Sequence, residues 1–189
     1  MEFINVDEAN ELLAQHGIER QAPDEDHAYL RMVADSTSQR HLAVPEGDVE
    51  PLPGAEVIEI SSDRMPEVID HILHKLHHNQ LILFPVGRWR SIFDVVAFSL
   101  AENEEWQRVD AAATVELNSR DPLFCDTGDL HLVCDLVKTL FHDSESPDQG
   151  LLLITAGLPL VMEVVPNGGV RLSFGNEAVA EEISEAITA

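Results

Sequence analysis

Segments with the apolar pattern of strands alternate with segments of helical spacing through most of the chain, and this alternation constrains the fold more than any other feature. Strands are expected at residues 55–60, 81–86, 109–117, 150–155, 159–165 and 170–174, and helices at 65–78, 89–102, 127–142 and 177–187. The resulting order, β-α-β-α-β-α-β-β-β-α, predicts an α+β (mixed α/β) fold in which helices flank a mixed sheet.

The connections between these elements predict two kinds of strand pairing. The early alternation of strand and helix is typical of crossover units, whereas the three consecutive strands near the end favour antiparallel neighbours. Asn167, Gly168 and Gly169 are expected to form the last turn, because Asn and Gly tolerate a positive φ.

Residues 1–54 are expected to form an N-terminal extension, and residues 55–189 the main α/β body. Residues 5–16 have helical spacing. Residues 23–35 fit either a helix or a strand that returns as a hairpin through 42–44, and the pattern does not separate these alternatives. The last ten residues of the extension hold three prolines and two glycines, which indicates a linker or an extended loop.

The chain is strongly acidic, with 35 Asp and Glu against 11 Lys and Arg and a formal charge of -24. Such a surface repels DNA, RNA and anionic membranes, so neither a nucleic acid nor a membrane is expected as a partner. Solubility or adaptation to salt explains the acidity most simply, since Lys75 and Lys138 are the only lysines. A dedicated basic partner is the functional alternative.

The N-terminal twenty residues lack a basic start and a continuous apolar stretch, so no targeting segment is expected there. Cys125 and Cys134 match no metal or redox spacing, and two cysteines make no disulfide framework. Free thiols are the default in a reducing compartment, so the protein is expected in the cytoplasm.

Four histidines fall on the expected helix 65–78, and three of them share one face with an acid. Glu67, His71, His74 and His78 form a stripe at spacings of four, three and four residues, opposite the apolar face. Imidazoles and a carboxylate at these spacings can bind Zn²⁺ or a similar metal, the only cofactor that the sequence raises. The stripe also fits a pH-sensitive contact surface, or an exposed polar face without a function.

A second candidate site lies where the expected strand 81–86 turns into the next helix. Gly87, Arg88, Trp89 and Arg90 combine two of the few cations with a tryptophan. Ligands collect at such turns in open sheets, and helix N-termini favour anions, so these residues predict an anion-binding site. The alternative is that the arginines pair with nearby acids while Trp89 packs.

A faint internal repeat links two of the helices. Residues 68–78 align at a constant offset with residues 132–142, and each helix leads into an apolar strand that ends in glycine. A duplicated α-β unit is one explanation; the simpler one is that any two helices facing a core share this spacing.

No catalytic motif of the P-loop, GxGxxG, HExxH or GxSxG type occurs. The sequence therefore predicts an acidic protein-binding or regulatory module, with a protein partner and a homodimer as an option. The alternative is a protein or enzyme that binds a small molecule, an anion or a metal through one of the two candidate sites. A third option, a mimic of nucleic acid, requires rows of carboxylates on one side, and the acids are instead spread along the whole chain.

Overall fold

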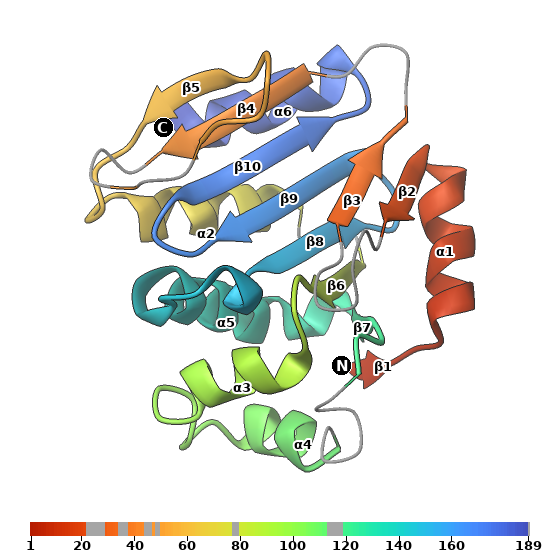
Figure 1. Cartoon of the computed structure of the whole chain (residues 1–189), viewed down its shortest axis with the longest axis vertical. Helices are drawn as coiled ribbons and strands as arrows, with labels where there is room; N and C mark the ends of the chain where they lie inside the picture. Colours follow the sequence, from red (N-terminus) through yellow and green to blue (C-terminus); the bar gives the residue numbers. More distant parts are fainter. Residues whose placement is uncertain are drawn as a thin grey trace.

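A mixed eight-stranded sheet forms the centre of the molecule (Figure 1), with a separate two-stranded sheet and six α-helices in the part of the chain described. The computed structural model describes residues 1–21, 29–33, 38–43, 47, 50–76, 80–112 and 119–188. The expected α+β fold and its approximate order of elements are confirmed.

The large sheet has the strand order β1-β7-β6-β8-β9-β10-β4-β5. Its strands are β1 (Glu2–Phe3), β4 (Ser38–Ala43), β5 (Glu56–Glu59), β6 (Leu81–Pro85), β7 (Leu123–Cys125), β8 (Leu151–Thr155), β9 (Leu160–Val165) and β10 (Gly169–Phe174). Neighbouring strands are antiparallel except for the parallel pair β4–β5.

Helices cover one face of this sheet, and a smaller layer covers part of the other (Figure 1). The helices are α1 (Val6–Gln15), α2 (Met65–Lys75), α3 (Trp89–Val96), α4 (Glu104–Ala112), α5 (Leu130–Asp143) and α6 (Glu177–Thr188). Strand β6 shows how one sequence serves both layers, since Leu81 and Leu83 pack with α2 and α5, whereas Ile82 and Phe84 pack with α1 and the small sheet. Such a strand is apolar throughout because both of its faces are buried.

The connections follow the two expected patterns. Helix α2 joins β5 to β6, and α5 joins β7 to β8, and in each case the two strands run in the same direction with other strands between them. Strands β8, β9 and β10 form an antiparallel meander. Asn167 and Gly169 have positive φ values of 54° and 118° in its last turn, which confirms that prediction.

The region between β6 and β7 differs from the expectation. The single helix predicted at 89–102 ends at Val96, and a second helix, α4, follows after a turn. The strand predicted at 109–117 is wrong where it is described, because residues up to Ala112 belong to α4. Asn103 explains the new helix, since its Oδ1 accepts hydrogen bonds from the backbone N–H groups of Glu105 and Trp106 at 3.0 Å.

The N-terminal residues contribute to both layers. Strand β3 (Tyr29–Met32) pairs with β2 (Ile18–Gln21), while β4 lies in the large sheet between β10 and β5. Of the two alternatives for residues 23–35, the strand is confirmed at Tyr29–Met32 and the helix is wrong there, while residues 22–28 and 34–37 lie outside the described residues. The return of this strand as a hairpin through residues 42–44 is wrong, because β3 pairs with β2. The parallel pair β4–β5 spans the expected boundary at residue 54.

Candidate metal centre

Helices α2 and α5, which carry the internal repeat, pack against each other beneath β6 and β8. The strands that follow them are antiparallel neighbours, with Leu83 opposite Leu153 and Ile82 opposite Ile154. Leu83 and Leu153 are the third residues of their five-residue strands, so the two strands pair along their whole length.

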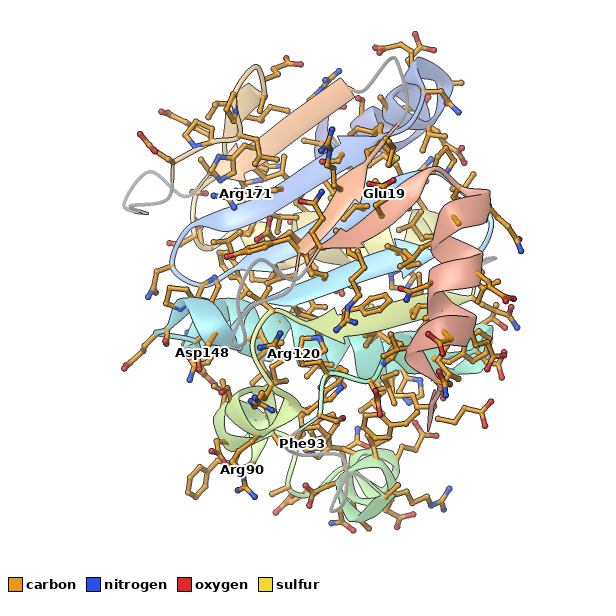
Figure 2. All side chains as sticks on the ribbon, turned by 45° about the vertical axis from the view of Figure 1, so that its right-hand side comes forward. Glu19, Arg90, Phe93, Arg120, Asp148 and Arg171 are labelled. Atoms are coloured by element: carbon orange, nitrogen blue, oxygen red, sulfur yellow. The ribbon has the colours of Figure 1, made fainter. Side chains whose placement is uncertain are left out.

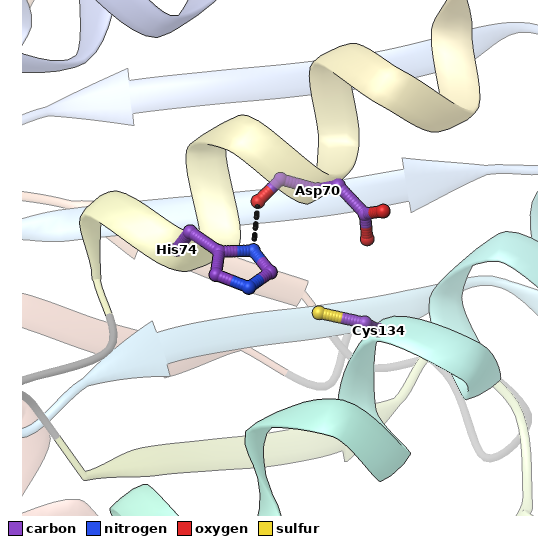
Figure 3. Close-up of side chains that lie close together, drawn as sticks. All are labelled: Asp70, His74 and Cys134. Atoms are coloured by element: carbon purple, nitrogen blue, oxygen red, sulfur yellow. Dashed lines mark hydrogen bonds between the residues drawn. The ribbon is translucent and has the colours of Figure 1, made fainter.

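Three potential metal ligands from these helices lie together at this contact (Figure 3). The side chains of Asp70 and His74 on α2 and of Cys134 on α5 point toward one another, and each offers one donor atom within 4.8 Å of the others. Asp70 and Cys134 occupy matching positions of the repeat, as do His74 and Lys138. The packing of α2 against α5 brings these donors together.

The imidazole of His74 is already oriented. Its Nδ1 lies 2.8 Å from the backbone carbonyl of Asp70, one helical turn earlier, and only a protonated Nδ1 can donate to that oxygen (Figure 3). This tautomer carries its lone pair on Nε2. A hydrogen bond from the second ring nitrogen to a carbonyl is how proteins fix metal-binding histidines.

The two oxygens of the Asp70 carboxylate have different contacts, and the thiol of Cys134 also makes a weak hydrogen bond to this carboxylate. Oδ2 accepts a hydrogen bond from Nζ of Lys138 at 3.0 Å. Oδ1 is buried and receives no hydrogen bond of ordinary geometry. A buried oxygen in this condition costs about 1–3 kcal/mol, which a bound cation would offset.

Cys134 supplies the third donor atom from a buried position. Burial raises the pKa of its thiol to about 12, and the neighbouring carboxylate of Asp70 adds to the effect. The thiol is therefore protonated and unreactive by itself. A transition metal bound to the sulfur would favour the thiolate instead, because a thiol that coordinates a metal loses its proton.

The donors need only a small adjustment to fit a tetrahedral ion. Ligand atoms around zinc lie about 3.3–3.8 Å apart, given bond lengths of about 2.0–2.3 Å. Small shifts of the three side chains that keep the hydrogen bond of His74 would close the remaining gap. A cavity of about 360 Å³ adjoins the three donors and is also lined by Thr127, His131 and Asp135. A fourth coordination position would face this cavity.

The helix stripe predicted from the sequence shares only His74 with this group. The apolar face of α2 is buried as predicted, and Glu67, His71 and His74 are exposed on its other side. His78 lies outside the described residues. Metal binding by the stripe stays a prediction.

The turn from Gly87 to Arg90 begins in contact with Asp148, which Figure 2 labels together with Arg90. The N–H of Gly87 donates to the carbonyl of Asp148 at 3.2 Å, and a Cβ on Gly87 would lie 2.6 Å from that oxygen. The carboxylate of Asp148 accepts a hydrogen bond from Ser91 in the first turn of α3. An incoming anion would meet this negative charge, and anion binding here stays a prediction.

The other residues of this turn have different environments. Trp89 is fully buried, and its indole N–H donates to the carbonyl of Asp121 at 2.7 Å. Arg88 and Arg90 are exposed, and Figure 2 shows Arg90 and Asp148 on opposite sides of α3. Packing accounts for Trp89, as the alternative interpretation of this turn expected.

Asp70 and Cys134 were not among the residues chosen from the sequence. Asp70 lies at the border of the apolar face of α2, and Cys134 resembles a small apolar residue in its helix. The constant offset of the repeat was the available signal, since it places the two residues at matching positions.

In the described part of the chain, no helix has both the length and the apolar character required to cross a bilayer. Comparison of the whole chain with protein-family models, with curated proteins and with solved structures finds no match, so the site is defined by its own geometry.

Proposed function

We propose that the protein binds one divalent transition-metal ion, of which Zn²⁺ is the best fit, between α2 and α5. The ligands are Oδ1 of Asp70, Nε2 of His74 and Sγ of Cys134. The observation that carries the proposal is the convergence of three different donor types from two helices within 4.8 Å. The buried oxygen of Asp70, which has no hydrogen bond of ordinary geometry among the described residues, and the tautomer of His74 support it.

The donor set selects the class of metal and the kind of site. A thiolate and an imidazole favour zinc and similar ions over Mg²⁺ and Ca²⁺, which prefer oxygen ligands. Structural zinc sites use four protein ligands, whereas three ligands with one open position are typical of sites that bind water or a substrate. The function proposed is therefore metal-dependent binding or activation of a small ligand in the adjoining cavity. A site that needs a reduced thiol suits the cytoplasm.

Zinc titration of untagged protein, first stripped with chelator, tests the proposal. We expect one Zn²⁺ per chain in native mass spectra and a more stable protein. Zinc at 100 times its Kd should add about 2.7 kcal/mol to the free energy of unfolding. That gain raises the midpoint of thermal unfolding by about 5–10 °C for a chain of this size. Co²⁺ should in addition give the near-ultraviolet absorption of a cobalt–thiolate bond.

Variants on the same helices separate this site from the histidine stripe. Cys134→Ser and His74→Ala should each weaken zinc binding by more than about 100-fold, since even outer partners of metal ligands are worth about 10–100-fold. His71→Ala is the matched control, because His71 is exposed on α2 outside the donor group. Wild-type protein that takes up no zinc contradicts the proposal. Equal loss in His71→Ala and none in Cys134→Ser would assign the metal to the stripe instead.

A second candidate function is binding of a basic protein partner through an exposed aromatic residue. Phe98, in the turn after α3, is 94% exposed, far more than any other large apolar side chain described. Asp94 and Glu102, four residues before and after it, are exposed, and the next residue, Ser99, donates a hydrogen bond to the exposed Asp143. An exposed aromatic residue with negatively charged neighbours suits a positively charged partner, because the aromatic ring supplies the main contact and the charges attract.

Selection from a displayed peptide library tests this second candidate. Peptides that bind wild-type protein should be rich in Arg or Lys and should carry an apolar residue. Their affinity should fall by at least about tenfold in Phe98→Ser, the size of a typical interface anchor, and it should also fall with added salt. Peptides without net positive charge, or peptides that bind Phe98→Ser equally well, would contradict it.

A further inference from the structure

A row of charged and polar residues crosses the face of the sheet that lies opposite the helices. Glu163 on β9, Arg171 on β10 and His41 on β4 are direct cross-strand neighbours. Figure 2 shows Arg171 on β10, on the side of the sheet that carries β2 and β3. This row is separate from the metal site, which lies among the helices on the other face.

The ion pair in this row is a loose one. Nη1 of Arg171 lies 3.3 Å and 3.5 Å from the two carboxylate oxygens of Glu163, whereas charge-assisted hydrogen bonds are about 2.7–2.9 Å long. Nη2 donates to the carbonyl of Glu50 at 2.8 Å, and the buried Nε has no hydrogen-bond partner among the described residues. The two charged groups therefore lie close together, but each keeps capacity for a stronger hydrogen bond to a ligand.

Arg171 is the cation of this row, because the third member, His41, is buried and neutral. The imidazole is 1% exposed, and among the described residues its contact with the backbone of Gly168 falls short of a hydrogen bond of ordinary geometry. Burial, together with the positive charge of Arg171, lowers the pKa of His41 below its usual value. A neutral His41 does not compete with Arg171 for an anion.

The ion pair faces a cavity whose remaining wall is mainly apolar. The cavity has a volume of about 260 Å³. Its wall combines Glu163, Arg171 and Ser173 with Tyr29, Leu30, Leu52, Leu152 and Val161. Apolar walls with a few convergent polar groups are typical of small-molecule sites, and drug-sized ligands need roughly 300–1,000 Å³. The cavity therefore suits a smaller molecule.

From this arrangement we infer that the cavity binds a free amino acid with an apolar side chain, such as leucine. Its carboxylate pairs with Arg171, its ammonium group pairs with Glu163, and its side chain packs on Leu152 and Val161. A ligand with a single charge would capture one member of the pair and leave the other unpaired in a poorly solvated place, at a cost in affinity. A zwitterion replaces both partners at once.

Calorimetric titration of the wild-type protein with a ligand series tests the inference without any substitution. Leucine should bind with one-to-one stoichiometry and a Kd of about 1 mM or tighter. The series adds 4-methylpentanoate, which lacks the ammonium group, leucine methyl ester, which lacks the carboxylate, and glycine, which lacks the side chain. Each should bind at least about tenfold more weakly, as expected for the loss of a charged or apolar contact. Salt at about 0.15 M screens general attraction of the ester to the acidic surface.

Variants then assign the binding to this cavity. Arg171→Gln and Glu163→Gln should each weaken leucine binding by at least about tenfold. Arg40→Gln is the matched control, since it breaks a cross-strand ion pair with Glu56, 2.9 Å long, on the face covered by helices. It should leave the affinity unchanged. If Arg171→Gln does not fold, Glu163→Gln and the ligand series still decide.

Absence of saturable leucine binding overturns the inference. So does 4-methylpentanoate or the methyl ester binding as tightly as leucine, because one charge would then suffice. Equal loss of binding in Arg40→Gln would place the ligand elsewhere. Zinc-stripped protein should bind leucine as well as zinc-loaded protein does, so this test and that of the metal site fail independently.

Discussion

Replacing Gly169 with alanine should lower the free energy of unfolding by about 3 kcal/mol or more, because backbone strain and a steric clash act at the same position. Gly169 begins β10 with a φ of 118°, where residues with a Cβ are rarely found. A Cβ built there would lie 1.8 Å from the carbonyl oxygen of Leu42 on β4. That oxygen belongs to the backbone, so the strands themselves must move apart.

Two other glycines separate the contributions of strain and contact. Gly17 has a φ of 66° but nothing within 4 Å of its Cβ position, so Gly17→Ala should cost about 1–2 kcal/mol from strain alone. Gly128 has neither a positive φ nor a near neighbour, so Gly128→Ala should be close to neutral. Urea unfolding of the three variants measures the differences. A Gly169→Ala cost no greater than that of Gly17→Ala would contradict the close approach of β4 to β10.

The close approach at Gly169 illustrates what the sequence could not provide. Glycine in an Asn-Gly-Gly turn was predictable from local backbone preferences, and so were most strands and helices, because their periodicity reflects which face is buried. The partner of β4 was not predictable in the same way. A strand of six residues fits several neighbours equally well, and the choice of β10 and β5 is made by contacts far apart in the chain.

The start of helix α4, which the predicted strand at 109–117 replaced, has a local signal in the sequence. Asn103 followed by Glu104 and Glu105 is a typical helix start, with a capping side chain and acids in the first turn. The alternating apolar residues that follow favoured a strand instead. Trp106 resolves the conflict, because in the helix it is buried against Phe93 with ring centres 4.7 Å apart.

The candidate sites were less predictable than the fold. A stripe of histidines on one helix is visible in the sequence, whereas Asp70 and Cys134 belong to different helices and meet only because α2 and α5 pack against each other. The same holds for Glu163, Arg171 and His41, which come from three strands. To predict a site formed by several helices or strands, one must know which of them are neighbours, and the periodicity of the sequence alone does not give this.

Replacing Trp89 with alanine should cost about 3–5 kcal/mol, the usual range for removing a buried tryptophan. Trp89 is fully buried at the start of α3, with edge-to-face contacts to Phe3 and Phe93 at ring-centre distances of 5.8 Å and 6.0 Å. Its indole N–H also donates to the carbonyl of Asp121 at 2.7 Å. Alanine leaves a cavity among these rings and an unpaired carbonyl at Asp121, so the midpoint of thermal unfolding should fall by about 6–20 °C.

Comparison with milder variants shows whether Trp89 acts through packing. Trp89→Phe keeps most of the ring contacts but loses the hydrogen bond to Asp121, and should cost about 1–3 kcal/mol. Phe98→Ala removes an aromatic ring that is 94% exposed, so it should change stability by less than about 0.5 kcal/mol. Calorimetry and urea unfolding measure all three.

If Trp89→Ala destabilised the protein as little as Phe98→Ala, the Trp89 ring would not be part of the core, and the prediction that Trp89 serves an anion site at Gly87–Arg90 would gain support. A large loss in Trp89→Ala with an intermediate loss in Trp89→Phe instead means that Trp89 fixes the turn through its packing, and that ligand binding there must depend on the exposed Arg88 and Arg90.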